Sequence, residues 1–327
     1  MNENKEIYSY EVEAYALMTQ VDRSVLQLNP VLQKYGYEFV AINIQDLERD
    51  FSDMVGLRKP YDPKGLVNLK EQGLSISNQF YETVVNSSLL GIDLILHGYV
   101  ILLKRIQTYE RKVVNYTFTA EESYGPTNEM HDFAMALMHQ LRLLKNDYAS
   151  YLFQFHIARD TRTVVMRYAG FGRKGFKIGK LNMTTEEVVR FGRLFTGKIV
   201  VTDLSRIAFE SFCIAHDIDD IKTQFITFMT ALESIFNLGA DQISHTVSRH
   251  LALVLSANKE EFLAHYRQIK KLYGTRSKIV HGDTVKTNLE VETDMLKTYT
   301  RQALQFSLTC SLSKKELFEE LNAKGFS

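Results

Sequence analysis

Apolar residues follow two different spacings along the chain, and the change falls after Met183. Before that point, short runs rich in β-branched and aromatic residues are separated by polar stretches, which is typical of strands mixed with helices. Beyond Thr202, apolar residues recur every three or four positions and proline is absent, which is typical of helices. The pattern predicts an α+β fold, with a mixed domain of helices and strands over residues 1–190 and an all-helical bundle over residues 191–327.

The N-terminal half is expected to contain at least four strands. The predicted strands cover residues 37–44, 94–106, 112–119, 151–157 and 163–168. The charged Tyr109–Arg111 stretch is interpreted as a hairpin turn between two of them. Residues 7–35 suit one or two helices, with Pro30 at a start or a break. A longer helix is expected over residues 128–144, after a loop at residues 121–126, because its apolar residues recur at helical spacing.

The C-terminal half is expected to be helical throughout. Thr184 and Glu187 have the spacing of a capping box, which predicts a helix that runs to Leu194. Further helices are expected over residues 203–216, 218–238, 241–255, 259–273, 276–281 and 290–321. The helix at 276–281 is predicted as a short element of its own.

Composition limits the kinds of protein that this chain can be. Its net charge is +0, with 45% hydrophobic and 24% charged residues, so wholesale disorder is excluded and any nucleic-acid site has to be a local basic patch. The two cysteines, Cys213 and Cys310, suit free thiols in a reducing compartment. The first residues lack a signal-peptide pattern, and the longest apolar run is too short to span a bilayer. We therefore expect a soluble cytoplasmic protein without a membrane partner.

One local basic patch is present, between Phe262 and Gly282, where the sequence contains no Asp or Glu. Within it, Arg276 lies five residues before His281. A histidine side chain can transfer protons near neutral pH, and an arginine can hold phosphate oxygens and stabilise the charge of a transition state. Together the two residue types indicate phosphodiester chemistry.

Helical geometry limits what this pair can do within one chain. On an ideal helix two residues five apart point about 140° away from each other. Arg276 shares its face with apolar neighbours such as Leu272 and Ile279, so it points toward packing and needs a buried partner. Glu233, inside an apolar stretch of a preceding helix, is the natural partner. The pair can form a site only at a frayed end or bend of the helix, or with a second copy of the chain; otherwise Arg276 is structural and His281 is a surface residue.

Other motifs carry less weight. Residues 170–175 match G-x-G-x-x-G, but a strand-like and glycine-broken stretch comes after them where a dinucleotide site needs a helix. Five histidines do not have the spacing of zinc ligands, so no metal site is predicted. These are His131, His139, His156, His245 and His250.

The stretches Thr230–Phe236 and Leu272–Gly282, in an all-helical C-terminal domain, resemble the HEPN superfamily and within it the ApeA-like group. The ribonuclease motif of that superfamily is an arginine, four to six residues and a histidine, and this chain has four residues between. The resemblance covers residues 200–325. Many active members have Asn, Asp or His after the arginine, whereas this chain has Ser277, which resembles the ApeA-like variant.

The resemblance implies a metal-independent endoribonuclease of a bacterial toxin or anti-phage defence system, without a cofactor. It assigns Arg276 and His281 to the catalytic motif and Glu233 to the acidic residue that helps to position the site. Such enzymes are usually homodimers in which the Arg/His pairs of two chains meet. The implied reaction is transesterification by the RNA 2′-hydroxyl, which leaves a 2′,3′-cyclic phosphate and a 5′-hydroxyl. The residues expected to contact RNA are Lys270, Lys271, Tyr273, Ser277 and Lys278.

Two further interpretations stay open at this point. The C-terminal domain can be a non-catalytic HEPN module that binds RNA or a nucleotide, or that only dimerises. An enzyme site within residues 1–180 is the other possibility, although the sequence shows no nucleophile elbow, phosphate cradle or metal motif there. If the C-terminal domain is the ribonuclease, the N-terminal domain is expected to sense a phage-derived or regulatory trigger.

Overall fold

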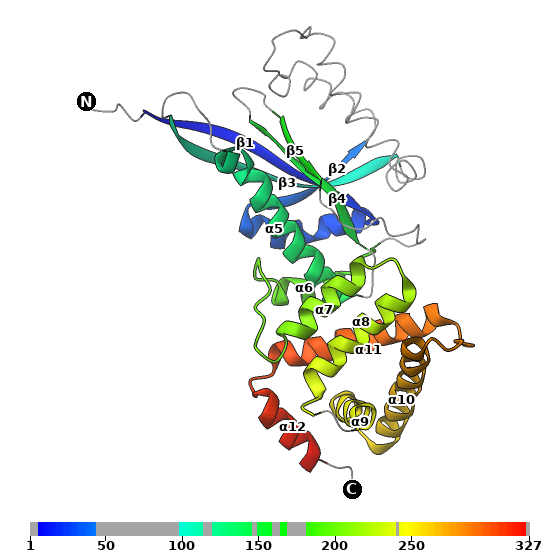
Figure 1. Cartoon of the computed structure of the whole chain (residues 1–327). Coiled ribbons are helices and arrows are strands. Elements are labelled where there is room, and N and C mark those ends of the chain that lie inside the picture. The colour runs from blue at the N-terminus through cyan, green and yellow to red at the C-terminus, as the bar shows by residue number, and fades with distance from the viewer. Residues whose placement is uncertain are drawn as a thin grey trace. The chain divides into compact units, whose positions relative to one another are not determined.

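The computed structural model describes residues 6–43, 98–113, 120–145, 149–158, 164–168, 181–239 and 242–324. These residues combine an antiparallel sheet and a long helix with a set of C-terminal helices, so the predicted α+β character is present (Figure 1). They divide into two compact units. The sheet, the long helix up to Leu141 and the residues up to Lys198 belong to the first unit, and Arg142–Lys145 and the residues from Ile199 onward belong to the second. The glycine-rich motif at residues 170–175 lies outside the described residues.

The sheet of the first unit has five strands in the order β2-β3-β1-β4-β5. The strands are β1 (Glu6–Thr19), β2 (Tyr37–Asn43), β3 (Tyr99–Val113), β4 (Ser150–Ala158) and β5 (Val164–Tyr168). All neighbouring pairs are antiparallel. The strands predicted near residues 37–44, 151–157 and 163–168 are therefore confirmed as β2, β4 and β5.

The central strand β1 contradicts the helix predicted from residue 7 onward. It pairs with β3 on one side and with β4 on the other. Residues Ala14–Met18 are all buried, so this part of the strand has a continuous apolar run instead of an alternating pattern. Such a run cannot be told from a buried helix by its periodicity, and here the pairing with two neighbouring strands decides the conformation.

The predicted hairpin around Tyr109–Arg111 is also wrong, because β3 continues through these residues as one strand. Tyr109 pairs with Tyr10 and Glu110 pairs with Ser9 across the sheet. The stretch contains no Gly, Pro, Asn or Asp, the residues that favour tight turns. Its charged residues are equally compatible with an extended strand.

Helix α5 (Ala120–Leu144) packs on the sheet. The ring of Phe133 stacks on Tyr37 of β2 at 3.6 Å between ring centroids, and Glu129 forms an ion pair with Arg105 of β3 at 2.8 Å. The predicted helix over residues 128–144 is confirmed, but the expected loop at 121–126 is wrong. Pro126 lies inside the helix, where it removes one backbone N–H donor without ending the element.

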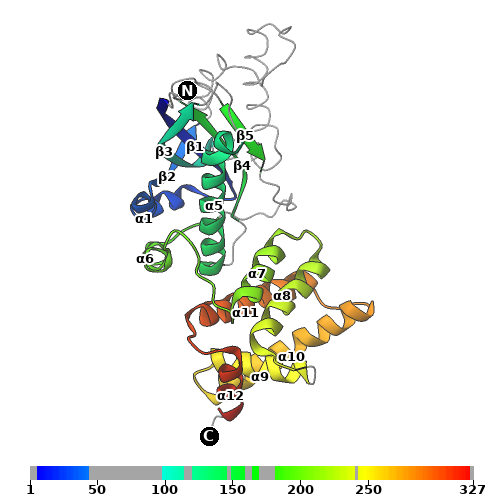
Figure 2. The same ribbon diagram turned by 60° about the vertical axis from the view of Figure 1, so that its left-hand side comes forward.

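Short helical segments connect β1 to β2, as Figure 2 shows for α1. They are two 3-10 helices, Arg23–Leu28 and Gln33–Tyr35, on either side of α1 (Asn29–Leu32), which has Pro30 in its first turn. The prediction of helix in residues 7–35 therefore holds only for its second half. Helix α6 (Thr185–Leu194) begins with the predicted capping box between Thr184 and Glu187.

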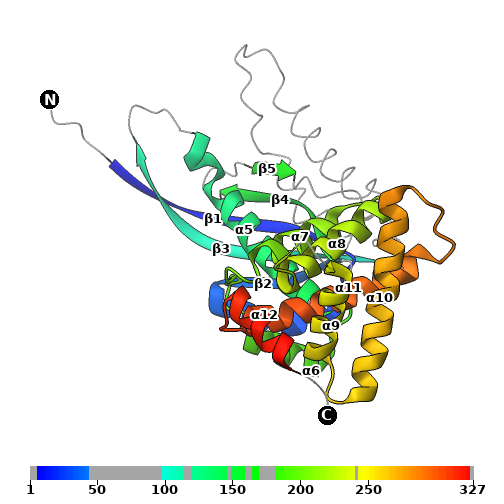
Figure 3. The same ribbon diagram turned by 60° about the horizontal axis from the view of Figure 1, so that its bottom comes forward.

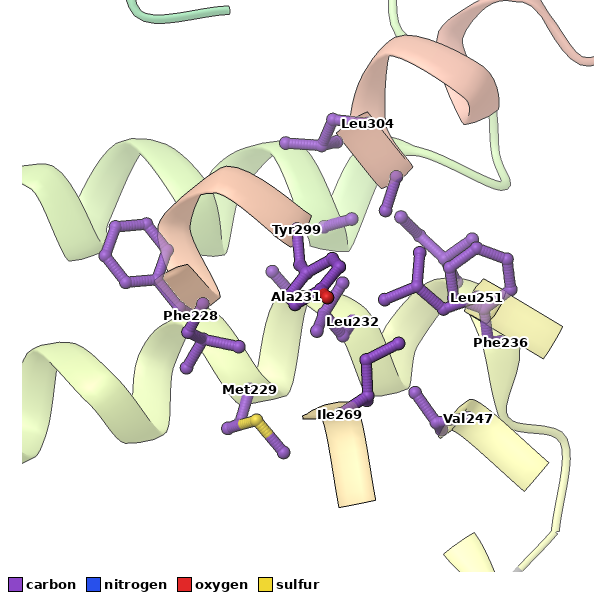
Figure 4. Packing of buried hydrophobic residues seen from close by; sticks show 14 of the residues in the cluster. Phe228, Met229, Ala231, Leu232, Phe236, Val247, Leu251, Ile269, Tyr299 and Leu304 are labelled. Carbon is purple, nitrogen blue, oxygen red and sulfur yellow. The ribbon is translucent and has the colours of Figure 1, made fainter. Parts of the chain in front are cut away.

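The second unit is helical in its described residues. Its helices are α7 (Arg206–Asp217), α8 (Ile221–Phe236), α9 (Ile243–Leu255), α10 (Lys259–His281), α11 (Leu289–Thr309) and α12 (Lys314–Ala323). Helix α8 packs mainly against α7 and α11, and α10 packs mainly against α9. Figure 4 shows the core between them, where Phe228 and Leu232 of α8 face the same cluster as Ile269 of α10. Among the described residues, no helix has both the length and the apolar character needed to cross a membrane.

Two helix boundaries differ from the prediction. Helix α10 is continuous through Gly274, so the short separate helix at 276–281 does not exist. A glycine inside a helix costs only about 1 kcal/mol, and the buried Leu272 and Tyr273 keep this stretch packed. The helix predicted over residues 290–321 is two helices, because Ser313 begins α12 with a capping box to Glu316.

Candidate functional site

Helix α10 carries the Arg/His pair, and its two ends have defined caps. The Asn258 side chain accepts a hydrogen bond from the Glu261 N–H at 2.9 Å at the N-terminal end. At the other end Gly282 has a φ of +76°, a left-handed conformation that favours glycine. The N–H of Asp283 donates back to the Lys278 carbonyl at 2.8 Å. His281 is therefore the last residue of a well-terminated helix.

Arg276 pairs with Glu233 of α8, as the sequence predicts. Its Nε lies 3.2 Å from Glu233 Oε1, and its Nη2 donates to Glu233 Oε2 at 3.5 Å. The Glu233 side chain is 18% exposed and the Arg276 side chain 35% exposed. The carboxylate is thus largely buried, while the guanidinium group keeps part of its surface open to solvent.

Tyr273, one turn before Arg276, lies beside this ion pair. Burial raises the pKa of the Tyr273 hydroxyl, and the charge of Glu233 raises it further. Burial likewise raises the pKa of the Glu233 carboxyl, and the Arg276 charge opposes this rise. The hydroxyl and the carboxylate lie close enough for each to shift the pKa of the other, although within the described residues Tyr273 makes no well-formed hydrogen bond. The three side chains form a compact polar group at the edge of the core.

His281 is exposed and makes no hydrogen bond or ion pair within the described part of the chain. Because α10 is continuous from Lys259 to His281, Arg276 is neither at a frayed end nor at a break. The two side chains therefore point about 140° apart around one helix axis. Of the arrangements that the sequence allows, a site closed by a bend within one chain is excluded. A site shared with a second copy and a structural Arg276 both stay open.

The residues expected to contact RNA do not share one environment. Lys270, Lys271, Ser277 and Lys278 are exposed on α10. Lys270 Nζ donates to Ser244 Oγ of α9 at 3.2 Å, and Lys271 Nζ lies 3.6 Å from Glu292 Oε1 of α11. Tyr273 is the exception, because it is only 6% exposed and cannot offer its ring to a base. Its place beside Glu233 suits a role in positioning that carboxylate.

A buried polar contact under this surface has no signal in the sequence. Glu292, in the first turn of α11, is buried and accepts a hydrogen bond from Thr275 Oγ1 of α10 at 2.6 Å. An acidic residue in a first helical turn is ordinarily explained by the helix dipole alone. Here the carboxylate also ties the start of α11 to α10, close to the Arg/His stretch. Its partner, Thr275, lies 17 residues away in sequence and has no motif that marks it.

The remaining histidines have separate surroundings. His250 contacts Asn322 Oδ1 at 2.9 Å through Nε2, and His245 contacts the Tyr266 hydroxyl at 2.9 Å through Nδ1. His156 of β4 is buried, and burial lowers its pKa to about 4. Among the described residues, no group of three or more His, Cys, Asp or Glu side chains is arranged to hold a metal ion.

Comparison of the chain with protein-family models, with curated proteins and with solved structures found no match in any of the three. The function of the chain is therefore inferred from the geometry of α8 and α10.

Proposed function

We propose that the chain is a metal-independent endoribonuclease of the HEPN type, active as a homodimer. The observation that carries the proposal is the position of the two motif residues on α10. Arg276 is oriented by a largely buried Glu233 and keeps about a third of its side-chain surface exposed, at 35%. His281 is exposed on another face of the same helix end. An oriented cation and an unengaged imidazole, each open to solvent, are what a site shared by two chains requires.

The proposed reaction needs no group beyond these side chains and the RNA itself. The 2′-hydroxyl oxygen attacks the adjacent phosphorus and loses its proton, and the bond from phosphorus to the 5′-oxygen breaks. His281 can accept the 2′-hydroxyl proton and then, as the imidazolium, donate it to the leaving 5′-oxygen, so no net proton is gained or lost. Arginine hydrogen bonds stabilise the extra negative charge on the phosphoryl oxygens as it develops. The products are a 2′,3′-cyclic phosphate and a 5′-hydroxyl.

In the proposed dimer each site takes His281 from one chain and Arg276 from its partner. This arrangement answers the divergence of about 140° between the two side chains on a single helix. Glu233 and Tyr273 then act as positioning residues that set the direction of the guanidinium group before RNA binds.

Cleavage of RNA by the purified chain in the presence of EDTA tests this function. The expected result is cleavage that leaves cyclic phosphate ends and falls by about 10²- to 10⁴-fold in His281→Ala, with an unchanged melting temperature. The unchanged melting temperature is expected because His281 has no partner within the described residues. Cleavage that persists in His281→Ala would contradict the proposal.

Mixing two inactive variants tests the shared site directly. A dimer of one His281→Ala chain and one Arg276→Lys chain retains one site with both motif residues intact. After subunit exchange in an equal mixture, about a quarter of the wild-type activity is expected to return, since half of the dimers carry one working site of two. No return of activity, from variants shown to exchange subunits, would mean that each site needs its residues from a single chain.

One observation favours a second function, a non-catalytic HEPN module. Glu233 already neutralises Arg276 within its own chain, which is also how a purely structural arginine is held. In that case the dimer or the RNA-binding surface persists, but the wild-type chain leaves RNA uncut in the same assay.

A further inference from the structure

One face of α10 is basic over its C-terminal half. Arg267, Lys270, Lys271 and Lys278 are exposed, and the residues from Phe262 to Gly282 include no acidic side chain. At about 100° per residue, these four residues lie within a sector of about 100° around the helix axis, and His281 lies inside the sector, about 20° from Lys270. We call this surface the basic ridge. Figure 3 shows α10 at the edge of the helical unit, where it packs mainly against α9.

Small side chains occupy the middle of the basic ridge, so the surface there lies close to the helix backbone. Gly274 and Ser277, which have small side chains, are exposed on the same face between the lysines. A Cβ added at Gly274 would meet no heavy atom within 4 Å, so the surface there is open. A chain of phosphates can therefore approach the helix closely between the charged side chains.

The end of the basic ridge away from His281 has an aromatic and polar border. Tyr266 of α10 is half-buried, its ring lies against Phe262, and its hydroxyl contacts Nδ1 of the exposed His245 at 2.9 Å. Lys270 reaches Ser244 of α9 at 3.2 Å, so the first turn of α9 joins this border. Proteins bind single-stranded nucleic acid with cationic surfaces that follow the backbone and with aromatic rings on which bases stack, and the ridge has cations and one bordering ring.

One acidic side chain from a neighbouring helix contacts the basic ridge, and it pairs with only one of the four cations of the ridge. Glu292 of α11 lies 3.6 Å from Lys271 Nζ but is itself buried. No ion pair engages Arg267, Lys270 or Lys278 within the described residues. These three residues supply the free positive charge of the surface.

We propose that the basic ridge binds a single strand of RNA that lies along α10, from the Tyr266–His245 border to His281. In its choice of RNA over DNA, the inference rests on the proposed function. The stretch from Arg267 to His281 is about 21 Å long, which matches about six stacked nucleotides. A duplex fits less well, because the charges follow one line along one helix and the bordering tyrosine needs an unpaired base to stack on.

The ridge also defines which motif residue the bound strand meets. His281 lies within the ridge sector, whereas Arg276 points about 140° away from His281 and faces Glu233. A strand held by one chain therefore reaches that chain's own His281 and meets the arginine of a partner.

Salt-dependent binding of a fluorescent 12-nucleotide single-stranded RNA tests the ridge. All variants are made in a full-length His281→Ala background, so that cleavage does not interfere. Each lost phosphate contact reduces the slope of log affinity against log salt by about 0.7 for a single strand. The double variant Arg267→Gln/Lys270→Gln is therefore expected to lower the slope by about 1.4, and Tyr266→Leu is expected to weaken binding about tenfold.

The matched control is Lys222→Gln/Lys315→Gln, which removes two exposed lysines from α8 and α12. It should leave the slope unchanged, and the variants that replace exposed charged side chains should keep the melting temperature of their background. A slope unaltered by the ridge variant overturns the inference. So does tighter binding of a duplex RNA or of an acidic peptide with the same number of charges.

The two proposals fail in different ways. If the wild-type chain binds RNA through the ridge but does not cleave it, the proposal of RNA binding by the ridge is supported and the proposed ribonuclease activity is contradicted. If cleavage depends on His281 but not on Arg267, Lys270 or Tyr266, the ribonuclease activity is supported and the proposal of RNA binding by the ridge is contradicted.

Discussion

At the scale of single residues, the contact between Arg276 and Glu233 is the best-defined feature of the candidate site. It joins α8 and α10 at 3.2 Å, with the carboxylate more deeply buried than the guanidinium group. Removing one member of a buried ion pair lowers the free energy of unfolding strongly, because the other charge then stays buried without a partner. Here solvent reaches Arg276, so the penalty is smaller than for a fully buried pair.

We expect Arg276→Ala to lower the free energy of unfolding by about 1–2 kcal/mol, after allowance for its partial exposure. Adding Glu233→Gln should recover most of this loss, because the amide no longer needs a cation. Urea unfolding of the four members of the double-mutant cycle measures the effect.

The matched control is Lys315→Ala, whose partner Glu319 lies 3.9 Å away with both side chains exposed. It should cost less than about 0.5 kcal/mol. Strictly additive effects of Arg276→Ala and Glu233→Gln would show that the two side chains do not stabilise each other.

At the scale of elements, α10 is continuous up to His281, so it holds Arg276 and His281 about 140° apart around one helix axis. It contains one glycine in its interior and ends at another, and the two have opposite conformational demands. Gly274 is helical with open space at its Cβ position, whereas Gly282 has a φ of +76°. Alanine suits the first position and is strained at the second.

The same substitution is therefore expected to have opposite effects at the two glycines. Gly274→Ala should raise the free energy of unfolding by about 0.5–1 kcal/mol through the helix propensity of alanine. Gly282→Ala should lower it by about 1 kcal/mol, because an L-residue with a side chain is disfavoured in the left-handed region. Thermal unfolding followed by circular dichroism checks both. Effects of the same sign would mean that α10 ends elsewhere in solution.

At the scale of the whole molecule, the proposed function needs a second copy to contact α10 near its C-terminal end. Val280, between Arg276 and His281 in sequence, is 56% exposed, so it offers an apolar surface near the C-terminal end of α10. We expect this valine to be covered in the dimer.

Val280→Lys is therefore expected to weaken dimerisation by more than about tenfold, since it places a charge in an apolar contact of both chains. Cleavage should fall in parallel while the melting temperature of the monomer stays the same. Light scattering during size-exclusion chromatography measures the oligomeric state. The control is Ile214→Lys on α7, where the isoleucine is similarly exposed at 57%. If Ile214→Lys dissociates the dimer instead, the interface lies on α7, and the proposal of a site shared at α10 is contradicted.

Much of the helical unit could be predicted from local patterns. The apolar stripe of α8 and the capping box of α6 depend on residues within a few positions of each other, and the helices predicted to end at Leu194 and over residues 203–216, 218–238 and 241–255 are confirmed within about three residues. The pairing of Glu233 with Arg276 was also predictable, because each is a charged residue on an otherwise apolar helix face. Sequence reasoning failed where distant parts of the chain decide the outcome. Residues Ala14–Met18 form a strand because β3 and β4 pair with them.

Helical periodicity and the need to pair a buried charge can both be applied to the sequence without a structure. They place an arginine and a histidine about 140° apart on a basic, acid-free stretch, and they identify Glu233 as the partner of the arginine. The folded chain was needed to show that α10 is continuous, that Tyr273 is buried beside Glu233, and that Glu292 ties α11 to Thr275. Burial and partner choice depend on residues that are distant in sequence and meet only when the helices pack.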